Sequence, residues 1–343
     1  MAYVALLVVF GLAADRLLAR ALFAHPSEYV PTHRSFYHPT VGVKLHRLRD
    51  RPRTDDAWFL GNSVTMLGVD PQSYDARLAA QGHQFRSFNL AMPSVGVTFW
   101  PQLLDRYLHG RFPRYLLLGV QPRDVDAAGV DQVSRPVERS FWTSEGTRNR
   151  NISRVNANAE EALARAYILW GRHGSFFPAA AGVAARGERF DPDDIGVDNA
   201  AGWSRFVERF VRPKAELEAG RLRYGHRRGG RFALAPDAVA SLRRLATTTS
   251  RNGGRLILFT LPTLYDSEPW GTTDIRREFV AAMRSLAPRL PSARFLDLGD
   301  DFASGYRTED FGDENHLLGP AAQRFSRELA DATLPLLDPH GPR

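Results

Sequence analysis

Residues 57–63 read AWFLGNS, and this short stretch decides the expected fold. The apolar run from Ala57 to Leu60 is long enough for a buried strand, and the Gly-Asn-Ser that follows it indicates a sharp turn. A helical stretch comes next, with Asp70-Pro71 at a turn and apolar residues at helical spacing. A buried strand, a turn and a helix in this order form the first part of a unit with parallel strands.

The same alternation continues along the chain. Further apolar runs predict strands at 85–92, 115–120, 255–261 and 294–298. Amphipathic spacing predicts helices at 99–108, 275–287 and 320–334. Alternating strands and helices are typical of a parallel sheet covered by helices. We therefore expect one α/β domain over residues 55–334 with about five parallel strands, followed by a tail at 335–343.

One segment, from about 126 to 234, breaks this rhythm. It contains connectors rich in glycine, proline and arginine, together with helical stretches predicted around 159–170 and 203–219. We interpret it as a largely helical insertion after the third strand, on the side of the sheet where active sites form. The arginine-rich stretch 221–231 could bind an anionic polymer, phospholipid heads or nucleic acid, or it could be a solvated loop.

The composition excludes several kinds of site. The chain of 343 residues is 43% hydrophobic, enough for a packed core rather than a disordered chain. It has no cysteine, which rules out disulfides, zinc–thiolate sites and a cysteine nucleophile. No cluster of side chains has metal-ligand spacing, so we expect neither a metal nor a cofactor. The net charge of +7 comes almost entirely from arginine, and we do not expect a nucleic-acid partner.

The N-terminal segment 1–24 is predicted to be a membrane anchor or signal-anchor helix, with a linker over 25–54. Residues 2–14 are apolar and uncharged, which is short for a span of roughly 20 residues, but a helix continued to Phe23 would be long enough. A buried or interfacial helix is the alternative. Basic residues follow the apolar run, and by the positive-inside rule this favours a cytoplasmic main domain.

Three polar side chains are predicted to meet at the carboxyl edge of the sheet. Ser63 follows the first strand at the start of a helix, where ligands bind in an open parallel sheet. A serine nucleophile needs a base that is oriented in turn by an acid. His316 and Asp313 lie three residues apart in the loop before the last helix, which opens at the same edge. We predict Ser63 as nucleophile, His316 as base and Asp313 as the orienting acid; alternatively, Ser63 is only a helix cap.

The order of these motifs resembles the SGNH (GDSL-like) hydrolase family. Gly61-Asn62-Ser63 is similar to the family's first block, and residues 313–317 (DENHL) are similar to its last block. Residues 88–94 (FNLAMPS) and 117–121 (LLGVQ) resemble the second and third blocks. The resemblance covers residues 55–125 and 255–334. It implies a three-layer α/β/α, flavodoxin-like fold, a Ser-His-Asp triad and no cofactor.

Two positions depart from the family pattern at the expected oxyanion site. The second block usually supplies a glycine N–H, where this chain has Ser94, with Gly96 as the alternative. The third block usually supplies an asparagine side chain, and the nearest amide here is Gln121. The resemblance thus implies oxyanion donors at Ser63, Ser94 and Gln121, and we count Asn62 among the substrate-binding residues. Loss of one donor costs about 10²–10³ in turnover.

A further resemblance, to exported, membrane-anchored members of the family, rests on residues 67–71 (LGVDP) and on the apolar start that ends in Asp15-Arg16. It implies a serine esterase or O-acyltransferase acting on acyl esters, acetyl above all, of a carbohydrate or cell-envelope polymer. It also implies an extracytoplasmic domain, against the charge pattern, and a membrane acyltransferase as a partner. The alternative is a catalytically impaired, membrane-tethered protein that binds or assembles polysaccharide, which the two oxyanion substitutions suggest.

Overall fold

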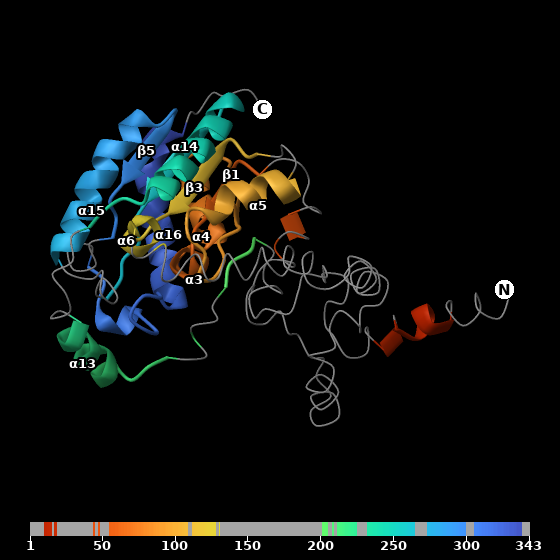
Figure 1. Cartoon of the computed structure of the whole chain (residues 1–343). Coiled ribbons are helices and arrows are strands. Elements are labelled where there is room, and N and C mark those ends of the chain that lie inside the picture. Colours follow the sequence, from red (N-terminus) through yellow and green to blue (C-terminus); the bar gives the residue numbers. More distant parts are fainter. Residues whose placement is uncertain are drawn as a thin grey trace, which may run out of the picture. The chain divides into compact units, whose positions relative to one another are not determined.

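The computed structural model describes residues 10–15, 17–18, 44, 47–48, 55–108, 112–127, 130, 201–204, 208, 211–224, 232–264, 273–299 and 305–337. The chain divides into two compact units, residues 1–50 with 139–197 and residues 51–138 with 198–343. The α/β domain belongs to the second unit (Figure 1). Most of the expected anchor and the helix predicted at 159–170 lie outside the described residues. Within the described ranges, no helix is both long and apolar enough to cross a membrane.

A five-stranded, all-parallel sheet forms the centre of the domain. Its strands are β1 (Ala57–Leu60), β2 (Ser87–Asn89), β3 (Tyr115–Gly119), β4 (Arg255–Phe259) and β5 (Ala293–Leu296). The strands lie in the order β2-β1-β3-β4-β5, which is the flavodoxin-like order. The predicted α/β fold with five parallel strands is therefore confirmed. The order reverses between β1 and β3, and in such sheets ligands bind outside the carboxyl ends of the strands at this point.

Helices cover the two faces of this sheet. They are α3 (Ser63–Gly68), α4 (Pro71–Ala80), α5 (Phe99–Leu108), α6 (Pro122–Val125), α13 (Lys214–Tyr224), α14 (Pro236–Arg251), α15 (Thr273–Leu286) and α16 (Gly319–Thr333), with short 3-10 turns η6 (Ala287–Arg289), η7 (Thr308–Asp310) and η8 (Leu334–Leu336). Successive residues of a strand point to opposite faces of the sheet. On one of these faces, Phe59 of β1 and Phe259 of β4 belong to a core cluster that also contains Tyr74 of α4 and Phe325 of α16. α14 crosses in front of the strands in Figure 1 and packs with α5 and β4.

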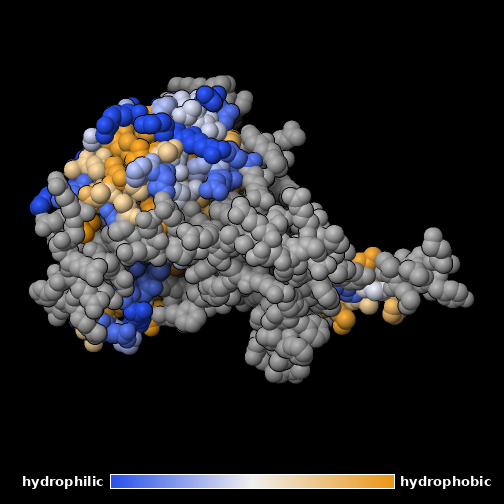
Figure 2. Space-filling view, in the orientation of Figure 1, coloured by the Kyte–Doolittle hydropathy of each residue, from blue (hydrophilic) through white to orange (hydrophobic). Residues whose placement is uncertain are grey.

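Two helices differ from the sequence expectation. No helix was expected at α14, although it begins at Ala235-Pro236 and buries one side against the sheet; its outward side is hydrophilic (Figure 2). The helix predicted at 203–219 was misplaced, because Trp203 and Ser204 belong to no helix and α13 begins only at Lys214. Pro213 explains the late start, since a proline disfavours the helical conformation of the residue before it. α13 then continues to Tyr224, inside the stretch predicted as a connector.

The two ends of the expected insertion lie side by side beyond β3. Asp126 and Leu234, at the expected limits of the insertion, form an isolated antiparallel bridge. Ala127 N donates to Ala233 O at 2.9 Å, and Ala235 N donates to Val125 O at 2.8 Å. Residues 131–200, between these two ends, lie outside the described residues. α14 therefore begins directly after the bridge that pairs the two ends of the expected insertion.

Candidate active site

Ser63 is placed by a sharp turn at the carboxyl end of β1. Gly61 has a φ of 141°, a conformation that residues with a side chain rarely adopt. A Cβ added there would lie 2.3 Å from Thr65 Oγ1 and 2.9 Å from Gly119 O, so the turn also has no room for one. Asn62 caps α3 by accepting a hydrogen bond from Val64 N at 2.9 Å. Ser63 is consequently the first residue of α3, at the edge of the sheet where the strand order reverses.

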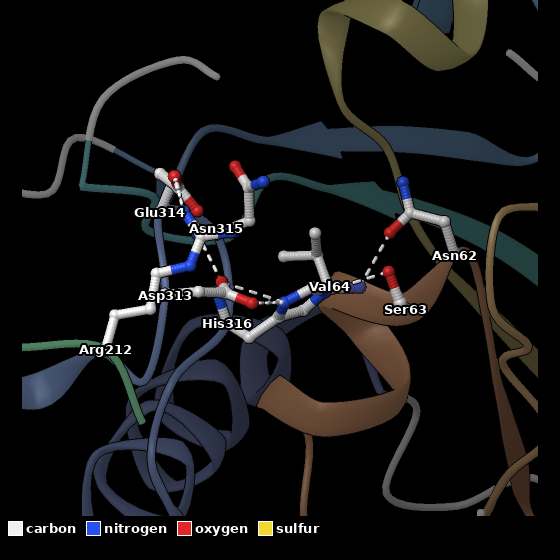
Figure 3. Close-up of polar contacts among 8 residues, drawn as sticks. All are labelled: Asn62, Ser63, Val64, Arg212, Asp313, Glu314, Asn315 and His316. Atoms are coloured by element: carbon white, nitrogen blue, oxygen red, sulfur yellow. Dashed lines mark hydrogen bonds and ion pairs between the residues drawn. The ribbon is translucent and has the colours of Figure 1, made fainter. Parts of the chain in front are cut away.

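The structure brings Ser63, His316 and Asp313 together, as Figure 3 shows. His316 Nε2 lies 2.8 Å from Ser63 Oγ. His316 Nδ1 lies 2.7 Å from Asp313 Oδ2 and 2.9 Å from Asp313 Oδ1. His316 and Asp313 side chains are 18% and 24% exposed, so the group is open to a reactant without being fully solvated. The order hydroxyl, imidazole, carboxylate is the one in which a serine can pass its proton to the ring.

A closed loop between η7 and α16 holds the histidine and the aspartate. Phe311 and Leu317 form an isolated antiparallel bridge at the base of this loop, and Gly312 N donates to His316 O at 3.0 Å. Asp313 Oδ1 accepts hydrogen bonds from the backbone N–H groups of Asn315 and His316, both at 2.9 Å. These local bonds orient the carboxylate toward the His316 ring. The Asp-x-x-His spacing therefore favours the pairing of the two side chains through contacts within the loop.

The environment of Asp313 favours its ionised form. Burial acts to raise its pKa, but the hydrogen bond and charge of the His316 ring and the two backbone N–H groups act in the opposite direction. The net result is a pKa below the ordinary value of an aspartate. Asp313 is thus a carboxylate at neutral pH, able to hold the Nδ1 proton of His316 and to stabilise the imidazolium.

Asn62 differs from its expected role. Its Nδ2 lies 2.8 and 3.0 Å from the two carboxylate oxygens of Asp124, while its Oδ1 accepts from Val64 N. Figure 3 shows the oxygen of this amide directed at Val64 and its nitrogen directed away from it. The side chain is 2% exposed and is turned to Asp124 rather than toward an oxyanion at Ser63. Asn62 therefore orients the turn that carries Ser63.

Gln121 lies directly after β3, across the reversal point from Ser63. Its backbone N donates to Asp124 Oδ2 at 2.9 Å. Its side-chain Nε2 is buried and has no hydrogen-bond partner among the described residues. A buried donor without a partner costs about 1–3 kcal/mol, and an acceptor that reached this amide would recover that free energy.

Ser94 and Gly96 lie in the loop after β2. Met92 N donates to Gly61 O at 3.0 Å, which ties this loop to the turn before Ser63. Ser94 has a φ of 57°, in the left-handed region that favours glycine. The position where the family pattern has glycine thus keeps a glycine-like backbone conformation even though it carries a serine.

Residues near the end of the insertion contact both sides of the site. Trp203 Nε1 donates to Leu67 O of α3 at 2.9 Å. Arg212 N donates to Gly312 O at 2.9 Å, and the Arg212 side chain forms an ion pair with Glu314 beside His316. Sequence reasoning did not single out Arg212 or Asn89, because their partners are distant in the chain. Among the described residues, no group of three or more histidine, cysteine, aspartate or glutamate side chains could hold a metal ion.

Comparison with known proteins finds solved structures that are similar to this chain. No protein-family model matches the chain, and no curated protein matches its sequence. A candidate platelet activating factor from Streptococcus pneumonia is 12% identical with a TM-score of 0.42, over 85% of this chain and 90% of that chain. The lipase/acylhydrolase from Enterococcus faecalis is 12% identical with a TM-score of 0.39, over 83% and 99%. A gut microbial diltiazem-metabolizing enzyme is 12% identical with a TM-score of 0.38, over 82% and 47%. Similarity at this level assigns no activity to this chain.

Proposed function

We propose that the protein is a serine esterase or O-acyltransferase of the SGNH (GDSL-like) type, with Ser63, His316 and Asp313 as its catalytic triad. The observation that carries the proposal is the 2.8 Å contact between Ser63 Oγ and His316 Nε2, with Asp313 on the other ring nitrogen. The three side chains come from the two ends of the domain and meet at the carboxyl edge of a parallel sheet, where ligands bind in this architecture.

The proposed reaction is acyl transfer in two steps. Ser63 Oγ attacks the acyl carbonyl as its proton passes to His316 Nε2, and Asp313 stabilises the imidazolium. The tetrahedral intermediate collapses, and the leaving alcohol takes the proton from His316, which leaves an acyl ester on Ser63. Water or a sugar hydroxyl then gives a proton to His316 and attacks this ester, which releases the acid or the transferred ester and restores Ser63.

Charge on the carbonyl oxygen needs hydrogen-bond donors during both steps. We assign this role to the backbone N–H groups of Ser63 and Ser94 and to the side chain of Gln121. The buried Nε2 of Gln121 supports the assignment, since it has no partner among the described residues and follows the strand beside β1. The glycine-like conformation of Ser94 supports it as well. Gly96 is the alternative donor in the same loop.

The substrate is proposed to be an acyl ester, acetyl above all, of a carbohydrate or a cell-envelope polymer. The domain is proposed to act outside the cytoplasm, tethered by the N-terminal segment and working with a membrane acyltransferase. Phe10, Leu17 and Leu18 support the tether, because these apolar side chains of the N-terminal unit are 73%, 67% and 48% exposed. Exposed apolar residues on a helical segment suit an interface with lipid.

Labelling with a fluorophosphonate serine probe tests the proposal. We expect the wild type to be labelled, and Ser63→Ala and His316→Ala to lose labelling while keeping the wild-type circular dichroism spectrum. Ser241→Ala, in α14, is the matched control and is expected to label like the wild type. A folded wild type that is not labelled would contradict the triad. It would favour the alternative of a membrane-tethered protein that binds or assembles polysaccharide on a hydrolase-like scaffold.

A further inference from the structure

We propose that Asp124 is a positioning residue: through a buried pair with Asn62, it fixes the position of Ser63 relative to Gln121. The inference rests on the proposed function, because it concerns the geometry of the same site. Asp124 does not touch a reacting atom in this scheme. It acts through two neighbours, one on each side of the point where the strand order reverses.

The contacts of the Asp124 carboxylate connect two turns. Both of its oxygens lie within hydrogen-bond distance of Asn62 Nδ2, at 2.8 and 3.0 Å, and Oδ2 also accepts from Gln121 N at 2.9 Å. Asn62 in turn accepts from Val64 N with its own Oδ1. The bond to Gln121 is local to α6, whereas the bond to Asn62 spans 62 positions of the sequence and joins the end of β1 to the end of β3. A helix cap alone would need only the local bond.

Because the side chains of Asn62 and Asp124 are buried, their polar atoms destabilise the fold unless they have hydrogen-bond partners. Asp124 is 3% exposed and Asn62 is 2% exposed. Burial raises the pKa of Asp124, while the charge of Arg123 and the hydrogen bonds from Gln121 N and Asn62 lower it, and the net pKa stays above the ordinary value. A polar group that loses its partner in such a place is strongly destabilised. The pair therefore has one well-defined geometry rather than several.

That geometry matters because α3 is short. Its six residues give Ser63 little support from the helix itself, so the contacts at its ends set the direction of the Ser63 hydroxyl and N–H. Gln121 has to reach the same developing oxyanion from the neighbouring strand. Misplacement of a reacting group by about 1 Å can cost about 100-fold in rate. A single carboxylate that bonds to both turns fixes their separation.

An exchange of the two side chains tests the inference. Asn62→Asp puts two carboxylates in buried contact, and we expect the rate of fluorophosphonate labelling to fall about 100-fold. Asp124→Asn keeps part of the bonding, and we expect a fall of about 10-fold. The double variant Asn62→Asp/Asp124→Asn restores an amide–carboxylate pair, and a carboxylate is also a good cap for α3. We expect it to label within about 5-fold of the wild type, a rescue that general destabilisation would not give.

Asp70→Asn is the matched control. Asp70 is also a buried aspartate that caps a helix, through Gln72 N and Ser73 N, but it has no described bond to the Ser63 turn. We expect this variant to melt at a lower temperature and to keep the wild-type labelling rate at a temperature where all variants are folded. Melting temperatures of the four forms of the Asn62–Asp124 pair are measured alongside, to give the coupling between the two side chains independently of labelling.

The outcomes separate the two proposals. If the wild type is labelled at Ser63 and the double variant recovers from Asn62→Asp, the inference holds. If the wild type is labelled but Asn62→Asp keeps its rate, or the double variant melts normally and stays slow, the inference is wrong and the proposed function stands. If the wild type is not labelled, the proposed function fails and the inference falls with it, even where the melting temperatures show that the buried pair is formed.

Discussion

Asn89 offers a sharp test of how the Ser63 helix is held at its other end. Asn89 is fully buried at the end of β2, and its Nδ2 lies 2.8 Å from Val69 O, 3.1 Å from Thr65 O and 3.2 Å from Met66 O. These carbonyls lie at the end of α3, where the last carbonyl groups of a helix lack partners in the next turn, although Thr65 O also accepts from the C-cap residue, Val69 N, at 3.1 Å. The change Asn89→Asp keeps the shape of the side chain and its acceptor for Ala91 N, but it removes both N–H groups and places an oxygen against the three carbonyl oxygens.

The magnitude follows from these contacts. An amide nitrogen has two hydrogens, so we count two hydrogen bonds of about 1 kcal/mol each for the three contacts. Leaving the buried carbonyls without a donor adds about 1–3 kcal/mol. We therefore expect Asn89→Asp to lower the free energy of unfolding by about 3–5 kcal/mol. For a domain of this size the melting temperature falls by roughly 6–20 °C.

Urea unfolding and thermal melts followed by circular dichroism measure the effect. Asn252→Asp is the control, because Asn252 also donates to a helix carbonyl, Thr248 O at 3.1 Å, but does so on the surface. We expect it to change the free energy of unfolding by less than about 0.5 kcal/mol. If Asn89→Asp costs no more than Asn252→Asp, the Asn89 amide does not hold α3 and the reasoning fails.

Three further predictions concern the site and the turn beside it. Asp313→Asn should lower stability by about 1–3 kcal/mol at neutral pH. Because the folded pKa of Asp313 is lowered, its contribution is complete above the unfolded value of about 3.9 and is lost as the pH falls through the folded value. Melts of both proteins from about pH 7 down to about pH 2 should therefore show a gap that is constant above about pH 5 and narrows below about pH 4, and a gap that stays constant to the acid end would contradict this. Ser94→Gly should be more stable than Ser94→Ala by about 1 kcal/mol in urea titrations, because only glycine adopts a φ of 57° without strain. Gly119→Ala should cost about 1–3 kcal/mol, since the new Cβ would lie 2.0 Å from Thr65 Oγ1, and adding Thr65→Ala should recover part of that loss in the same melts.

The sheet could be predicted from sequence because its strands are buried on both faces. Continuous apolar runs such as 115–120 appear wherever helices cover both sides of a strand, and they mark these strands without any knowledge of their partners. The contacts of Ser63, His316 and Asp313 follow from the same logic. Strand ends converge at one edge, and the Asp-x-x-His loop closes on itself through local hydrogen bonds.

Features that depend on distant partners were not predictable in this way. Asn62 has the local pattern of a helix cap, but nothing near it in the sequence indicates Asp124 as its second partner. Asn89 was expected within a longer strand at 85–92, whereas its amide bonds to the end of α3. α14 was missed although its buried side carries Leu242 and Leu245, because that segment follows directly on the insertion. The start of α13 was set by Pro213, a local signal that outweighs the apolar spacing before it.

The return path of the insertion has a consequence for exchanging it between proteins. Trp203 bonds to the helix that begins at Ser63, and Arg212 bonds to the loop that carries Asp313 and His316, so the last part of the inserted chain also holds these two elements. Its sequence therefore has to fit those two elements of the sheet domain. A chimaera that replaces the whole stretch between Asp126 and Leu234 would remove both bonds. One that keeps the chain from residue 201 onward would retain both bonds.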